Sequence, residues 1–314
     1  MVRKANIDIA RGIGIIFVVY GHTFCPFKAY IYLFHMPLFF LLSGLLYNDS
    51  KSIKEYIISK FKTLIIPYGY FIIIINLIFI MLLLILDKPI FIYPGMLINP
   101  YGATLTLWFF LALFNVCIFF KLIDSLNSNY TKLLIIFFLF ITGLFFSDNK
   151  IRIPFYIDSA LTSLVFFAAG FYSKKNKLIK YFCYFFSLIV GLYYLYIDRM
   201  PVVDLKENIF NDPSCIFISL SLSFLVIDLS SRLEKYKLIQ MLFSYLGKKS
   251  LIIFSLHILA LEFIYLFLPK NNEIYALLNT FLAILITLLM SKMLKFEIQL
   301  TYLQDKMDLI KRKP

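Results

Sequence analysis

Three histidines, His22, His35 and His257, are the side chains of this sequence best suited to chemistry. An imidazole changes its protonation state near neutral pH, so each ring can serve proton transfer. All three lie in or beside long apolar runs, where an ionisable side chain is expensive and predicts a functional role. The alternative for each histidine is a hydrogen-bonded packing residue.

The segment Ile7–Thr23 (IDIARGIGIIFVVYGHT) carries Asp8, Arg11 and His22 within one apolar run. At 100° per residue, the step from Arg11 to His22 returns to nearly the same helix face after about 16 Å. Asp8 lies three residues before Arg11 and can pair with it. We expect this polar face to turn toward an interior cavity. The plainer interpretation is an Asp8–Arg11 pair at the water boundary, with His22 packed.

The composition predicts an integral membrane protein. Hydrophobic residues make up 61% of the 314 residues, charged residues make up 16%, and the mean hydropathy is +0.85. Such long apolar runs are typical of an all-α polytopic bundle, not of a soluble domain. The spans consume nearly the whole chain, so we expect one membrane domain over residues 1–314, with no appended soluble domain and no cleavable signal peptide.

Ten apolar segments predict about ten transmembrane helices. They are Ile7–Cys25, Tyr30–Tyr47, Leu64–Leu86, Leu105–Phe120, Leu133–Phe146, Asp158–Tyr172, Tyr181–Ile197, Ser214–Leu229, Leu251–Leu268 and Ile274–Leu294. Between the second and third segments, Asn48–Lys62 has apolar residues at helical spacing and four lysines. This pattern predicts a helix that lies along the membrane surface.

The distribution of positive charge predicts the orientation. With ten spans and the N-terminus inside, 24 of the 31 Lys and Arg residues fall on the cytoplasmic side. Both termini are therefore expected in the cytoplasm, with Arg11 near the inner face and His22 toward the outer half. Topology accounts for the net charge of +13, so no nucleic-acid partner is expected. We therefore predict a multi-pass protein located in the cell membrane, which in bacteria is the inner membrane.

The remaining polar and sulfur-bearing residues give weaker signals. No His, Cys, Asp or Glu spacing fits a metal motif, so no metal is expected, and GxSxG and P-loop motifs are absent. The four cysteines are dispersed, and we expect free buried thiols, with a Cys25–Cys215 disulfide as the alternative. Asn115 and Glu262 are further candidate cavity liners, or residues at an interface or a span end. Asp158 and Trp108 are further candidate site residues. Trp108, Tyr101 and Tyr156 are otherwise interpreted as aromatics at the membrane interface.

At these positions the sequence resembles the acyltransferase-3 family of integral membrane acyltransferases. The Arg11-to-His22 spacing resembles the opening helix of that family, and FHMPLFFLLSG (Phe34–Gly44) resembles its second helix. Three later stretches are similar to the branch that includes fucose 4-O-acetylase-like enzymes: Thr106–Phe114, Ile157–Phe171 and Leu246–His257. The likeness is distributed over residues 7–257. It implies a bundle of about ten helices that moves an acyl group, usually acetyl, from acyl-coenzyme A to a sugar hydroxyl.

That resemblance leads to a specific hypothesis. His22 is the general base, and His35, brought to similar depth by a short hairpin, is an oxyanion donor or an orienting partner. Arg11 bonds the phosphates of acetyl-CoA or groups beside them, and Asp8 holds Arg11 in place. The pantetheine arm, about 15–20 Å long, is comparable to the rise of about 16 Å between the two sites. Gly12, Gly14 and Gly21 leave room for a neighbouring helix or for the arm.

Two functions of other classes remain open from the sequence. One is a transporter or flippase of a lipid-linked sugar, in which the buried polar groups line a path. The other is a non-catalytic membrane subunit of a polysaccharide-synthesis complex. The absence of an internal repeat speaks against the transporter. For the enzyme, the expected acceptor is a cell-surface or lipid-linked saccharide.

Overall fold

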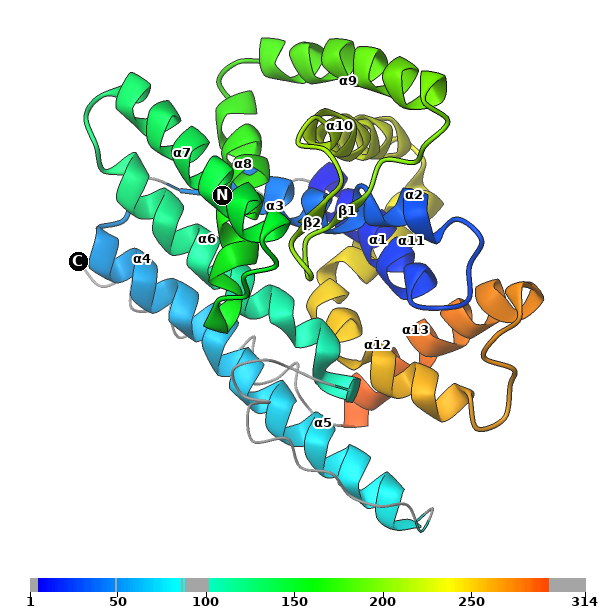
Figure 1. Ribbon diagram of the computed structural model, residues 1–314. Coiled ribbons are helices and arrows are strands. Elements are labelled where there is room, and N and C mark those ends of the chain that lie inside the picture. The colour runs from blue at the N-terminus through cyan, green and yellow to red at the C-terminus, as the bar shows by residue number, and fades with distance from the viewer. Residues whose placement is uncertain (1–4, 49, 86, 88–101, 294–314) are drawn as a thin grey trace.

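The computed structural model describes residues 5–48, 50–85, 87 and 102–293, and these form a helical bundle (Figure 1). In chain order the elements are α1 (Ala5–Gly21), α2 (Lys28–Tyr32), α3 (His35–Leu45), α4 (Ile53–Lys60), the π-helical turn η1 (Phe61–Ile65), α5 (Ile66–Ile85), the 3-10 helix η3 (Gly102–Leu107), α6 (Trp108–Asp124), α7 (Asn129–Asp148), η4 (Pro154–Tyr156), α8 (Ile157–Ser173), α9 (Leu178–Tyr196), β1 (Val203–Asp204), β2 (Ile209–Phe210), α10 (Cys215–Leu233), α11 (Lys237–Lys248), α12 (Ser250–Ile264), η5 (Glu273–Tyr275) and α13 (Ala276–Met293).

The predicted all-α membrane bundle is confirmed. Within the described residues, eight helical segments are long and apolar enough to cross a bilayer. Two of the ten predicted spans correspond to the shorter helices α1, with 17 residues, and α12, with 15 residues. The outward faces of α7 and α9 are apolar, with Phe138 69% exposed and Leu195 78% exposed. Such faces suit contact with lipid.

The predicted surface helix over Asn48–Lys62 is not separate from the third span. Helix α4 continues through η1 into α5, so that Ile53–Ile85 is one helical run. It begins at a capping box, in which the Ser52 hydroxyl accepts from the Glu55 N–H and the Glu55 carboxylate accepts from the Ser52 N–H. Pro67 has no N–H and its ring crowds the preceding turn, and the π-helical turn just before it relieves that crowding without ending the helix.

The second predicted span is broken close to its start. Helix α2 ends at Tyr32 and α3 begins at His35. Pro37 lies in the first turn of α3, where it cannot donate to the Leu33 carbonyl and its ring would clash with that group in a continuous helix. The break therefore places His35 at the start of a helix instead of in the middle of one.

Helix α1 lies inside the bundle and contacts α3, α10, α11 and α12. Its approach to α11 is very close, because an added Cβ on Gly12 would lie 2.1 Å from the Phe243 carbonyl oxygen. On the other side of the same contact, a Cβ on Gly247 would lie 1.8 Å from the Asp8 carbonyl oxygen. Of the two uses predicted for Gly12, room for a neighbouring helix is the one that the structure shows.

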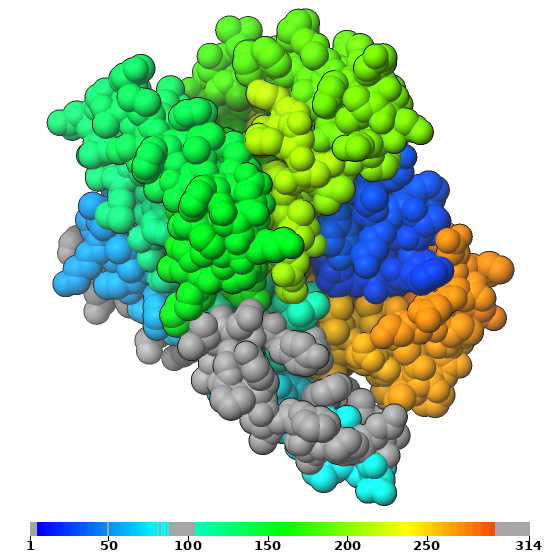
Figure 2. Space-filling model, in the orientation of Figure 1, coloured from blue at the N-terminus to red at the C-terminus, as the bar shows by residue number. Residues whose placement is uncertain are grey.

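A short antiparallel hairpin, β1–β2, interrupts the helices between α9 and α10. Val203 pairs with Phe210, and Asp204 pairs with Ile209. Figure 1 shows the hairpin against the middle of the bundle, and in Figure 2 this connection runs as a yellow-green strip between the green surface of α8 and the blue N-terminal helices. The connection between α9 and α10 is thus built into the bundle.

Candidate functional site

A cavity of about 120 Å³ lies at the C-terminal end of α1. Its wall combines side chains from α1, α2, α3, η3, α6, α12 and the hairpin. The polar members are His22, Tyr32, His35, Thr106, Trp108, Asp204, Lys206 and Glu207. A concave site with a few convergent polar groups on a mostly apolar wall is typical of small-molecule binding.

His22 lies in the turn that ends α1, where its N–H donates to the Val19 carbonyl at 3.1 Å. Its half-buried ring is at a centroid distance of 5.0 Å from that of His257 and 6.4 Å from the ring of Tyr32. The Tyr32 ring in turn lies 4.9 Å from that of His35. The structure therefore brings all three histidines of the chain into one cluster.

Backbone carbonyls assign the tautomers of two of these rings. His35 Nδ1 lies 2.8 Å from the Ile31 carbonyl oxygen, and His257 Nδ1 lies 2.9 Å from the Phe254 carbonyl oxygen. A carbonyl oxygen only accepts, so each Nδ1 carries the hydrogen and each neutral ring presents an Nε2 lone pair. His257 is fully buried, and its Nε2 has no hydrogen-bond partner in the described part of the chain.

Asp8 and Arg11 lie at the opposite end of α1 and do not line the cavity. Arg11 Nη1 is 3.9 Å from Asp8 Oδ1, with the Asp8 side chain 4% exposed and that of Arg11 30% exposed. The predicted pairing of these two residues is therefore present. One helix joins a positively charged group at one end to an imidazole in a cavity at the other end.

Three of the other candidates have structural partners outside the cavity. The Asn115 amide donates to the Phe155 carbonyl at 2.8 Å and so holds η4, where Phe155 has a φ of 62°. The fully buried Asp158 forms an ion pair with Arg152 at 3.3 Å. Glu262 pairs with Lys270 at 3.6 Å, and its side chain is 44% exposed. None of the three lines this cavity.

Two of the aromatics predicted at the membrane interface are buried inside the bundle. Trp108 and Tyr156 are each 4% exposed, and their ring centroids lie 5.7 Å apart. Trp108 lines the cavity, whereas Tyr156 does not. Tyr101 lies outside the described residues. Packing against each other and the bundle buries the two rings more completely than a membrane interface would.

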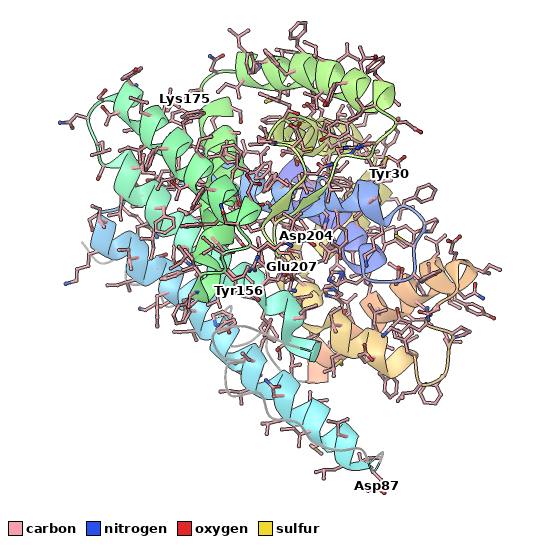
Figure 3. All side chains as sticks on the ribbon, in the orientation of Figure 1. Tyr30, Asp87, Tyr156, Lys175, Asp204 and Glu207 are labelled. Carbon is pink, nitrogen blue, oxygen red and sulfur yellow. The ribbon has the colours of Figure 1, made fainter. Side chains whose placement is uncertain are left out.

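Sequence reasoning missed the hairpin residues and Thr106. The sequence DLKE (Asp204–Glu207) places three charged side chains in four positions of a loop, and loops held by a rigid scaffold commonly carry function. Asp204 Oδ1 accepts hydrogen bonds from the backbone N–H groups of Lys206, at 3.0 Å, and Glu207, at 3.2 Å. Burial raises the pKa of the Asp204 carboxyl above its usual value, against the lowering effect of these N–H groups. Figure 3 labels Asp204 and Glu207 on the hairpin.

The described residues contain no group of three or more His, Cys, Asp or Glu side chains that could hold a metal ion. The four cysteines are free and buried. The thiols predicted as free are therefore confirmed, and the alternative Cys25–Cys215 disulfide is not formed. The polar chemistry of the cavity rests on imidazole, hydroxyl, indole and charged hairpin groups.

The fold and the cavity define a multi-pass membrane protein with a buried imidazole cluster. Comparison with protein families matches residues 4–292 to the acyltransferase-3 family, described as an acyltransferase domain. The match covers most of the chain, and the protein belongs to that family of membrane acyltransferases. No curated protein and no solved structure matches the chain.

Proposed function

We propose that this acyltransferase is a membrane O-acetyltransferase that moves an acetyl or other short acyl group from cytoplasmic acyl-CoA to a hydroxyl of a polysaccharide or lipid-linked sugar. The observation that supports it best is the position of His22, which lines the cavity together with His35 and lies with its ring centroid 5.0 Å from that of His257. An imidazole within reach of a bound hydroxyl is the group that such a transfer needs. The bacterial inner membrane is the proposed location.

The reaction follows from the donors and acceptors in the wall. His22 takes the proton of the acceptor hydroxyl as its oxygen attacks the thioester carbonyl carbon. The carbon–sulfur bond then breaks, and the proton passes from His22 to the leaving thiolate. The His257 Nε2 lone pair is suited to accept from a His22 N–H, which would fix the orientation of the base. A thioester of small acyl size is consistent with a cavity of about 120 Å³.

Of the two roles predicted for His35, orienting partner is the one its tautomer supports. Its Nδ1–H is engaged by the Ile31 carbonyl, so a neutral His35 has only a lone pair to offer the cavity. An oxyanion requires hydrogen-bond donors. In this wall, the Trp108 indole N–H and the Tyr32 hydroxyl are donors of the required kind.

The donor would enter from the Arg11 end of α1. The partly exposed Arg11 guanidinium is proposed to bind the phosphates of coenzyme A, held by Asp8. An arm of about 15–20 Å then matches the rise of about 16 Å from Arg11 to His22. Because α11 closes the face of α1 at Gly12, the arm must follow another face of that helix.

The test is acetyl transfer from radiolabelled acetyl-CoA by the purified full chain in detergent. His22→Gln is expected to lower kcat about 10²- to 10⁴-fold, the contribution of a general base. Phe24→Leu is the matched control, because Phe24 lies in the same turn, is 50% exposed and does not line the cavity. Unchanged turnover by a folded His22→Gln protein removes His22 from the mechanism. Sugar flux in liposomes without thioester cleavage would support a transporter instead.

A further inference from the structure

The charged turn of the β1–β2 hairpin forms part of the cavity that holds His22. Asp204, Lys206 and Glu207 all line it, and none of them is required for the acyl-transfer steps above. Lys206 Nζ is paired with the Glu207 carboxylate, so the Asp204 charge is left to give this wall a net negative charge. A wall of this kind disfavours anionic ligands and suits neutral ones that carry hydrogen-bond donors.

The turn is held firmly against the bundle. Arg152 Nη2 donates to the Lys206 carbonyl at 2.7 Å, and Arg152 is itself paired with the buried Asp158. Two residues after Lys206, the Asn208 side chain is 1% exposed, donates to the Gly143 carbonyl at 3.0 Å and accepts from the Thr162 hydroxyl at 2.8 Å. Contacts to α7 and α8 therefore fix where the Asp204 carboxylate meets the cavity.

A second observation in the same cavity points to a ligand. The Thr106 side chain lines the cavity and is 2% exposed, yet its hydroxyl has no hydrogen-bond partner in the described part of the chain. A buried hydroxyl without a partner is unfavourable, and a hydrogen bond from a bound hydroxyl would offset that cost. The Trp108 ring beside it offers the flat apolar surface on which the C–H face of a sugar ring packs.

We propose that Asp204, Thr106 and Trp108 form the acceptor site, and that its ligand is a neutral sugar with adjacent free hydroxyls. The Asp204 carboxylate accepts from one hydroxyl, the Thr106 hydroxyl exchanges a hydrogen bond with another, and Trp108 covers the apolar face of the ring. This assignment rests on the proposed function for the reaction that follows binding, because His22 lies in the same cavity. Binding itself is measurable without that reaction.

The only tryptophan of the chain, Trp108, makes its fluorescence a direct reporter of this cavity. The purified full chain, in a polyoxyethylene detergent that carries no sugar, is titrated with glucose, fucose and N-acetylglucosamine, and with glucuronate as the anionic probe. We expect a saturable change in emission with at least one neutral sugar and a weaker one with glucuronate. Failure of all three neutral sugars to give a saturable change overturns the proposal.

Two variants localise the site. Asp204→Asn is expected to weaken neutral-sugar binding about tenfold or more, the effect of losing a charge-assisted hydrogen bond. Thr106→Val keeps the side-chain shape, and we expect weakening of about fivefold. Asp212→Asn, in the same connection but outside the cavity, is the matched control and should bind as the parent protein does. Equal affinity in the parent protein, Asp204→Asn and Thr106→Val overturns the assignment.

The same preparations separate this inference from the proposed function. Sugar binding that depends on Asp204, without acetyl transfer from acetyl-CoA, supports the acceptor site and contradicts the proposed reaction. Acetyl transfer to a sugar with a KM that Asp204→Asn leaves unchanged supports the reaction and overturns the site.

Discussion

The rings of His22 and His257 lie with their centroids 5.0 Å apart, although one ends the first helix and the other lies in α12. Two backbone carbonyls hold the Nδ1 hydrogen of His257, and its buried Nε2 has no other partner in the described residues. In the proposed mechanism His257 orients His22 and does not contact substrate, because it does not line the cavity.

His257→Phe keeps most of the ring volume and removes the Nε2 lone pair. In the proposed mechanism His22 then loses its orienting partner. We therefore expect kcat to fall about 10- to 100-fold, with the KM for acetyl-CoA little changed and the pH profile of kcat shifted. Steady-state kinetics across the pH range measures all three. Ser255→Ala is the control on the same helix, since Ser255 is buried and its hydroxyl bonds to its own helix. Parallel losses of kcat and melting temperature without a pH shift would indicate a packing role.

Arg152→Ala should destabilise the protein more than Asp158→Asn does. Loss of Arg152 leaves a fully buried carboxylate without its ion partner, whereas Asp158→Asn leaves an Arg152 side chain that is already 39% exposed. We expect about 1–3 kcal/mol for Arg152→Ala, a range reduced for that exposure. Thermal unfolding in detergent compares the two variants. A larger loss in Asp158→Asn would show that the charge of Asp158 is not what Arg152 compensates.

Gly44→Ala should disrupt the contact between α3 and α8. An added Cβ at Gly44 would lie 1.9 Å from the Phe167 carbonyl oxygen, a backbone atom that cannot move aside without shifting a helix. We expect a loss of at least about 2 kcal/mol, seen as a lower melting temperature and a poorer yield of monodisperse protein. Gly191→Ala is the matched control, because nothing lies within 4 Å of its added Cβ. That change should stabilise α9 by about 0.5–1 kcal/mol. Equal behaviour of the two variants would contradict the close packing at Gly44.

Asp204→Asn should alter how stability depends on pH. Burial raises the pKa of Asp204 above its usual 3.8, so the charged carboxylate costs stability in the folded protein. This cost is absent below the unfolded-state pKa, where both states are protonated, and is complete above the raised folded-state pKa. The melting temperature of Asp204→Asn relative to the parent protein should therefore increase as the pH rises above the usual carboxyl pKa of 3.8. A relative melting temperature that decreases over that range would contradict the direction of the shift.

The sequence by itself determined the class of fold and the neighbourhood of His22. Apolar runs predict membrane helices because a buried backbone must satisfy its own hydrogen bonds, and that requirement is local. The short connection between α1 and α3 likewise made it predictable that His22 and His35 line one cavity. The Asp8–Arg11 pair followed from a spacing of three residues.

Only the tertiary structure decided which distant groups complete the cavity. His257 joins the cluster because α12 packs against α1, and Trp108 is buried in the wall at the start of α6. The charged turn at Asp204 reaches the cavity because Arg152 and Asn208 tie its hairpin to the bundle. Contacts of this kind depend on which helix faces meet across long stretches of sequence, and local hydropathy carries no information about that choice.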